Sequence, residues 1–260
     1  MSILTFNNTA ESNCWQKHSQ PHRGTALSVF SLQGKNDSLE AMALKFERVG
    51  LAPNYVDYSS ALELQQATHQ KVAAKQQQNT VLILEHQAVI TAGKRTESHE
   101  YPSDQSTPVI KIDRGGKLTW HGPGQLVGYP IVLLGRRGRD LHQWLRLLEE
   151  LLIRTLAEFA LPAERRPGLT GVWCERGKIG FIGVGVRRWV SLHGFSLNVC
   201  PDLAAFNSIV PCGLPSCPVT SMAATISPAP APEAVAGVLG RLFPALLDER
   251  LPLVPAPPAS

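Results

Sequence analysis

Cys212 has the strongest local signs of reactivity in this chain. It lies in the segment Ile-Val-Pro-Cys-Gly at 209–213, between a proline that fixes the backbone and a glycine that leaves nearby amide N–H groups accessible. A nucleophilic thiolate needs positioned donors and access rather than an apolar bed. The pattern therefore predicts a nucleophile at Cys212. The alternative is a buried free cysteine that packs as a small hydrophobic side chain.

The other cysteines compete less well for this role. Cys174 and Cys200 lie in or beside strand-like segments and are expected to pack, while Cys217 with Cys212 and His193 has a spacing that matches no usual zinc site. We therefore expect no metal and no cofactor. Five cysteines without paired spacing favour free thiols in a reducing compartment, so a cytoplasmic protein is expected.

Lys178 precedes a small, apolar run at 179–186. A lysine there is either a surface residue or a desolvated amine near a reaction centre, and position alone favours the surface. Close to a cysteine, its ammonium form would favour the thiolate, and its free amine could accept a proton. His121 and His193, each followed by glycine, are candidate general bases or, equally, structural histidines.

The stretch at 114–134, RGGKLTWHGPGQLVGYPIVLL, combines glycines and prolines with Arg114 and His121. Glycine lets the backbone approach a ligand closely, and proline stiffens the turn. The stretch is predicted to form the wall of a binding site. A complicated turn between two strands is the alternative.

The elements that must position these residues follow from periodicity and punctuation. Ser60 and Glu63 form a capping-box pattern, and Asp140 is a predicted N-cap. The expected elements are a helix at 60–77, strands at 81–85, 89–91, 109–112, 118–120 and 125–134, a helix at 141–159, a hairpin of 171–175 and 178–186, strands at 189–193 and 195–199, and a helix at 233–248. This mixture predicts an α/β domain with a mixed sheet (α+β).

Composition bounds the class of protein. The chain has 260 residues, 43% of them hydrophobic and 18% charged, with a net charge of +4. We expect a single domain at 54–250, with a disordered or variable extension at 1–53 and a disordered tail at 251–260. A lysine-rich run and a membrane-length apolar run are both missing, so neither nucleic acid nor membrane is an expected partner.

Several motifs together resemble the octanoyltransferase family, the lipoyl(octanoyl) transferases that start lipoate synthesis. They are RGGKLTWHGPGQLVGYP at 114–130, GVWCERGKIGFIG at 171–183, HGFSLNV at 193–199, and DLAAFNSIVPCG at 202–213 with TSM at 220–222. The resemblance runs in order from about Tyr55 to Met222. EHQAV at 85–89 is similar to the family's Glu-His-Pro-Pro-Val segment with both prolines replaced.

The resemblance implies a biotin/lipoate ligase-like catalytic domain that moves an octanoyl group from octanoyl-acyl carrier protein to a lysine of lipoyl domains. The implied acceptors are 2-oxoacid dehydrogenases and the glycine cleavage H protein, and no ATP is needed. The cysteine matching Cys212 forms an acyl-thioester, and the lysine matching Lys178 lowers its pKa. Lys178 is also a candidate base for the incoming amine.

Two further groups of residues are assigned on this basis. The acyl pocket is expected to be lined by Arg114, Gly115, Gly116, Lys117, Leu118, Thr119, Trp120, His121, Phe181, Ile182, Gly183, Gly194, Phe195 and Ser196. Acidic carrier and lipoyl domains are expected to meet Arg136, Arg137, Arg139, Arg187 and Arg188.

Three alternatives remain open. An ATP-dependent lipoate or biotin protein ligase is favoured by the Gly/Arg run GRRGR at 135–139, but would leave Cys212 without a role. A cysteine hydrolase would resolve the acyl-enzyme with water instead of an amine. A non-catalytic protein that binds carrier or lipoyl domains would need neither Cys212 nor Lys178.

Overall fold

A mixed seven-stranded sheet forms the centre of the part of the chain that the computed structural model describes, residues 43–104, 106–210, 213 and 217–254. Its strand order is β1 (Leu44–Gly50), β2 (Asn79–Leu84), β6 (Gln125–Ile131), β10 (Val190–Asn198), β9 (Gly177–Arg187), β8 (Leu169–Cys174) and β7 (Glu164–Arg166). β1 and β2 are parallel, and the other neighbouring strands are antiparallel.

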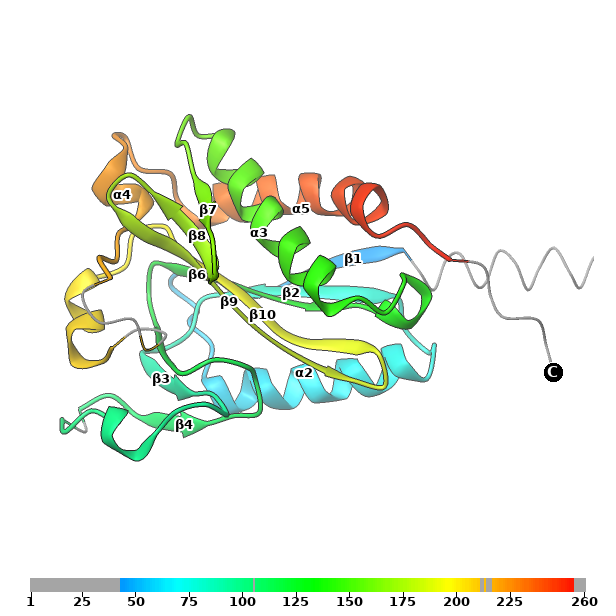
Figure 1. Cartoon of the computed structure of the whole chain (residues 1–260), viewed down its shortest axis with the longest axis horizontal. Helices are drawn as coiled ribbons and strands as arrows, with labels where there is room; N and C mark the ends of the chain where they lie inside the picture. The colour runs from blue at the N-terminus through cyan, green and yellow to red at the C-terminus, as the bar shows by residue number, and fades with distance from the viewer. Residues whose placement is uncertain (1–42, 105, 211–212, 214–216, 255–260) are drawn as a thin grey trace, which may run out of the picture. The chain divides into compact units, whose positions relative to one another are not determined.

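Helices cover both faces of this sheet (Figure 1). α3 (Leu141–Ala157) and α5 (Pro232–Arg250) pack on one face, where their leucines join the largest hydrophobic core. α2 (Tyr58–Ala73) packs on the other face against β2 and β6. Because β2 and β6 are covered on both sides, all their residues are buried, which agrees with their nearly continuous apolar sequences.

The helix boundaries follow local capping chemistry. Asp140 caps α3 as predicted, since its side chain accepts a hydrogen bond from Gln143 N at 2.9 Å. α2 begins earlier than expected, because Asp57 rather than Ser60 is its cap and accepts from Ser60 N at 2.9 Å. α5 continues through Pro244 to Arg250. None of the described helices is long and apolar enough to cross a membrane.

A smaller sheet carries the first strand of the glycine-rich stretch at 114–134, whose second strand, β6, belongs to the main sheet. Its strands are ordered β4 (Val109–Lys111), β3 (Val89–Ala92) and β5 (Leu118–His121). Its side chains form a separate small core with Phe181 of β9 and Phe206 of η3 (Leu203–Ser208), a 3₁₀ helix. The short elements η1 (Ser98–Glu100), η2 (Leu134–Arg136) and α4 (Met222–Thr225) complete the described fold.

Two expectations from the sequence need correction. An ordered strand, β1, lies inside the segment assigned to an N-terminal extension, and its Leu44 and Phe46 pack against the main core. Seven residues are too short for a clear periodic signal. The strands expected at 189–193 and 195–199 are one strand, β10, because Gly194 continues the ladder opposite Gly183.

Candidate active site

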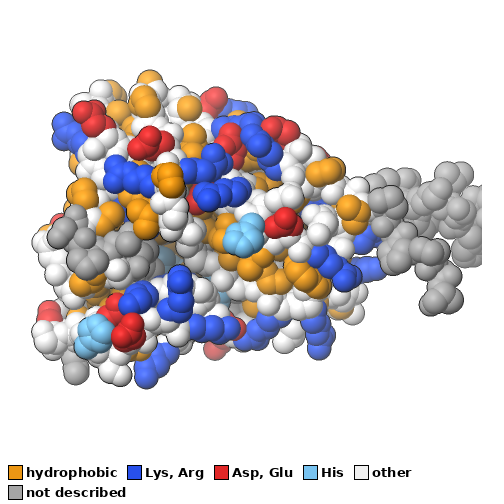
Figure 2. Space-filling view, in the orientation of Figure 1, with side chains coloured by type: hydrophobic (Ala, Val, Ile, Leu, Met, Phe, Trp, Pro, Cys, Tyr) orange, Lys and Arg blue, Asp and Glu red, His pale blue; other side chains and the backbone are white. Residues whose placement is uncertain are grey.

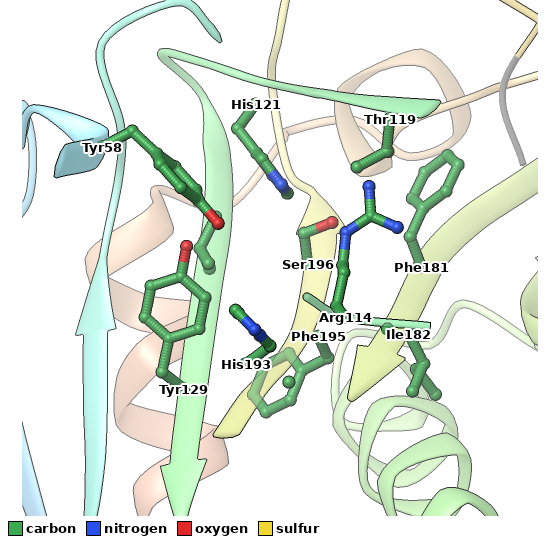
Figure 3. Close-up of a pocket in the computed structure, with 13 residues that line it drawn as sticks. Tyr58, Arg114, Thr119, His121, Tyr129, Phe181, Ile182, His193, Phe195 and Ser196 are labelled. Atoms are coloured by element: carbon green, nitrogen blue, oxygen red, sulfur yellow. The ribbon is translucent and has the colours of Figure 1, made fainter. Parts of the chain in front are cut away.

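An open pocket lies between the two sheets and the start of α2 (Figure 3). Nine residues expected from the sequence line it: Arg114, Thr119, His121, Phe181, Ile182, Gly183, Gly194, Phe195 and Ser196. Four that were not assigned to the pocket also line it: Tyr58, Val127, Tyr129 and His193. Alternation along β6 places Val127 and Tyr129 on one face, but sequence alone does not tell which face meets a pocket.

The remaining residues expected in the pocket do not line it: Gly115, Gly116, Lys117, Leu118 and Trp120. Leu118 and Trp120 alternate with Thr119 and His121 along β5 and point into the small core instead. Lys117 bonds to Glu97 and Glu100 at 3.2 and 2.8 Å. These five residues therefore contribute to the conformation of the glycine-rich stretch at 114–134 and do not contact the cavity.

Lys178 is buried, with 1% of its surface exposed, so the surface position favoured by the sequence is wrong. Its Nζ donates to Thr170 O at 2.9 Å and lies 4.7 Å from the ring centre of Trp173 and 5.1 Å from that of Phe181. Its backbone pairs with the segment 218–220. Because Phe181 lines the pocket, the amine lies behind the aromatic wall at that end.

Gly171 makes room for this amine. A Cβ at position 171 would lie 2.7 Å from Lys178 Cε, 3.1 Å from its Nζ and 2.7 Å from Gly180 O. The Gly171 φ of +131° also favours glycine. The first glycine of GVWCERGKIGFIG, Gly171, is therefore needed to leave space for the Lys178 side chain.

Cys212 lies outside the described residues. The glycine that follows it, Gly213, has a φ of +66°, and a Cβ added at this position would lie 2.4 Å from Lys117 Cδ. Position 213 therefore lies against the glycine-rich stretch. Cys174 is buried and Cys217 is half-buried. Cys200 is the exposed one, but partial desolvation of its thiol and the nearby charge of Glu85 raise the pKa of that thiol, which disfavours its thiolate.

Histidine and tyrosine rings cluster at another wall of the pocket. His86 Nδ1 donates to Val56 O at 3.0 Å, so its Nε2 accepts from the Tyr129 hydroxyl at 2.6 Å. His121 Nδ1 donates to Gln125 Oε1 at 2.7 Å. Burial lowers the pKa of His86 to about 4 and that of His121 to about 3. Neutral His121 is therefore a poor general base and a good orienting group.

The phenol of Tyr58 belongs to the same cluster. Its ring stacks on that of His121 at 6.3 Å, and burial raises its pKa to about 12. Burial also raises the pKa of Tyr129. Both phenols therefore stay protonated near neutral pH, and Figure 3 shows their hydroxyls facing one another.

His193 is held by an acidic residue. Its Nε2 lies 2.8 Å from Asp113 Oδ1, and Asp113 also pairs with Arg187. Burial lowers the pKa of His193 despite the opposing effect of Asp113. Arg114, next in sequence, crosses to the small sheet and donates to Thr91 O and Oγ1, both at 2.9 Å.

The arginines expected to meet acidic partners do not share one role. Arg137 is buried, and its guanidinium donates to Leu251 O and Asp248, so its assignment to a docking surface is wrong. Arg188 is exposed. On the face in Figure 2, acidic and basic side chains are interleaved over α3 and α5. Arg154 of α3 pairs with Glu249 of α5, and Arg165 of β7 pairs with Glu150 of α3.

No cluster of three or more His, Cys, Asp or Glu side chains that could hold a metal occurs among the residues with a described position.

Comparison with known proteins places the chain in a family. The model of the lipoyl protein ligase A/B catalytic domain matches residues 57–243. An octanoyltransferase of Geobacter metallireducens is 51% identical over 78% of this chain and 96% of its own length. One of Cutibacterium acnes is 41% identical over 88% of each chain. The chain belongs to the octanoyltransferase family.

Solved structures agree at the level of the fold. The chain is similar to LipL1 of P. falciparum in complex with lipoate, with a TM-score of 0.63 and 11% identity over 82% of this chain and 65% of that one. A lipoate protein ligase from Thermoplasma acidophilum has a TM-score of 0.60 and 14% identity over 80% and 84% of the two chains. The lipoate ligase-like fold and the acyltransferase class are thereby confirmed.

Proposed function

We propose that this protein transfers an octanoyl group from octanoyl-acyl carrier protein to the ε-amine of one lysine in a lipoyl domain. The observation that carries the proposal is the buried Lys178, whose Nζ lies 5.1 Å from the ring centre of Phe181 in the pocket wall. A lysine enclosed by aromatic rings beside an apolar pocket suits reaction of an acyl chain better than structural support. The names of the relatives support octanoyl as the acyl group.

The proposed reaction has two steps. The Cys212 thiolate attacks the octanoyl thioester, so that a new carbon–sulfur bond forms, the carrier's carbon–sulfur bond breaks and the carrier thiolate takes a proton. The acceptor amine then attacks the acyl-enzyme, an amide bond forms and the Cys212 thiolate leaves. Conversion of a thioester to an amide is downhill, so ATP is not consumed.

Lys178 serves both steps in this proposal. As an ammonium it favours the Cys212 thiolate, and as a free amine it accepts the proton that the acceptor lysine loses. Because the two substrates bind one after the other, one site serves two bulky protein domains. The proposed acceptors are lipoyl domains of 2-oxoacid dehydrogenases and the glycine cleavage H protein, in the cytoplasm.

The pocket supports selection of an acyl chain by length. Phe181 offers apolar side-chain surface, and Ile182, Gly183, Gly194 and Phe195 also line the pocket along β9 and β10. Each methylene buried there contributes about 0.8 kcal/mol until the pocket ends. Longer chains gain nothing once the end is reached.

Intact-mass analysis after mixing with octanoyl-acyl carrier protein in ATP-free buffer tests the thioester. We expect one octanoyl adduct, lost in Cys212→Ala and kept in the control variants Cys174→Ala and Cys217→Ala. An adduct on another cysteine would overturn the assignment of Cys212. Transfer that needs ATP and free octanoate would instead identify a ligase.

A second experiment tests Lys178. Lys178→Ala should slow both adduct formation and transfer to a lipoyl domain at least a hundredfold, since general acid–base groups contribute about that much or more. Circular dichroism checks that the variant folds. A folded variant with full activity would refute the role of Lys178.

A further inference from the structure

The pocket has two chemically different ends along the β9–β10 pair. At one end, Phe181 pairs with Ser196, and three residues further along β10 the strand reaches His193, which pairs with Val184. Three strand residues span about 10 Å, close to the length of an extended octanoyl chain. Gly183 and Gly194, paired between these ends, add no side chain to the space between them.

His193 reaches this pocket only because its backbone departs from regular strand geometry. Alternation should turn His193 to the same face as Phe195, toward the core under α3 and α5. The φ of His193 is instead +57°, in the left-handed region. Its side chain therefore lies on the α2 face, where its Cδ2 would be 3.3 Å from a Cβ added to Gly185. A strained non-glycine residue inside a strand points to a local function.

The imidazole is fixed with one nitrogen available. Nε2 faces the Asp113 carboxylate at 2.8 Å, so it carries the hydrogen and donates. Nδ1 is then an acceptor, and it is buried with no hydrogen-bond partner among the residues that the structure describes. The His193 side chain is 3% exposed.

Two other groups that line the pocket have buried polar atoms with no hydrogen-bond partner in the described part of the chain, and both are hydroxyls. They belong to Thr119 and Ser196, and Ser196 pairs with Phe181 at the end near Lys178. Hydroxyls can donate to an acyl carbonyl, whereas the Nδ1 lone pair of His193 cannot. The two ends therefore fit an acyl chain with its carbonyl near Ser196 and its methyl end toward His193.

We propose that His193, held by Asp113, closes the far end of the acyl pocket and sets the length of the acyl chain that the enzyme accepts. The inference rests on the proposed acyl transfer. The hydrogen bond from Nε2 to Asp113 fixes the ring, so a chain longer than the space between Ser196 and His193 would have to displace the imidazole from that bond. The cost of breaking a hydrogen bond to a charged group exceeds the gain from burying one more methylene.

Chain-length profiles of transfer test the inference. Hexanoyl, octanoyl, decanoyl and dodecanoyl groups on acyl carrier protein are compared by kcat/KM in the wild type, His193→Gly and the surface control His142→Ala. Glycine tolerates the left-handed φ and opens the end of the pocket. The decanoyl-to-octanoyl ratio should rise about tenfold in His193→Gly, because two further methylenes become buried, and should not change in His142→Ala.

A second variant and a second readout keep the test decisive. If His193→Gly does not fold, His193→Asn, which also tolerates positive φ, should shift the profile the same way by a smaller factor. Thermal shifts with free fatty acids of the same lengths report binding without chemistry. An unchanged length preference in a folded variant would overturn the inference. Absence of transfer by the wild type would instead refute the proposed function, while fatty-acid binding would still decide the role of His193.

Discussion

At the scale of single residues, Gly171 and Lys178 form one unit in which the glycine makes room for the amine. Gly171→Ala would place a Cβ 2.7 Å from both Lys178 Cε and Gly180 O. We expect this substitution to displace the amine, reduce octanoyl transfer at least tenfold and destabilise the fold by about 2 kcal/mol. Enzyme assays and urea denaturation measure the two effects.

Gly168 is the matched control. It lies in the turn before β8 with a φ of +76° and nothing within 4 Å of its ideal Cβ. Gly168→Ala therefore meets only backbone strain and should keep the rate of transfer. Equal losses of activity in the two variants would contradict the proposed link between Gly171 and the position of Lys178.

His86 and His121 predict how stability depends on pH. Their folded pKa values of about 4 and about 3 lie below the ordinary value of 6.5. Between these values the unfolded chain binds more protons, so the free energy of unfolding should be fully present above pH 6.5 and fall as the solution is acidified. Each histidine contributes a slope of up to about 1.4 kcal/mol per pH unit.

Chemical denaturation between pH 4.5 and 7 measures this slope. His121→Asn should flatten the profile, whereas the exposed-site variant His142→Ala should keep it. A stability that does not change over this range would show that the two rings are not held neutral by burial.

The sequence indicated which residue types were suited to chemistry at the site, but it could not show which of their side chains are buried. Lys178 stood out because it opens an apolar run, yet its enclosure by Trp173 and Phe181 depends on strand pairing and on the segment 218–220. His193 was singled out as a candidate base. Its place in the pocket follows from a left-handed backbone that no local pattern announces.

At the scale of elements, Glu85 connects segments that are distant in sequence. Its buried carboxylate accepts from Ala52 N at 3.0 Å and from Gly124 N in the glycine-rich stretch. Glu85→Ala leaves two backbone donors without this acceptor and should lower the free energy of unfolding by about 3 kcal/mol. Urea denaturation of this variant and of Glu63→Ala, an exposed change on α2, tests the expectation, which equal stabilities would contradict.

Elements with a strong period were predicted well. α3 was expected at 141–159 and extends over Leu141–Ala157, because its apolar stripe and the Asp140 cap are both local. β10 was divided at Gly194, because an isolated glycine in a strand pattern resembles a break. Pairing with β9 and β6 on either side keeps the strand continuous, and this non-local cause is absent from the local sequence.

At the scale of the whole described domain, β1 adds an edge strand that the sequence did not predict. Phe46 meets Phe243 of α5 edge-on at 6.1 Å and packs beside Gly240. Phe46→Ala should destabilise the domain by about 1–2 kcal/mol, less than a fully buried phenylalanine, because the ring is half-buried. Denaturation curves of Phe46→Ala and of Lys45→Ala, its exposed neighbour, measure the difference, and equal midpoints would place β1 outside the cooperative unit.

The burial of Lys178 has a consequence for engineering. An amine fully enclosed beside Trp173 and Phe181 occupies a volume that methionine would fill without the cost of desolvating a polar group. Lys178→Met is therefore expected to melt at the same or a higher temperature while losing transfer. Selection of variants for heat tolerance alone would discard this lysine, so a screen for robust forms of the enzyme must select for turnover as well.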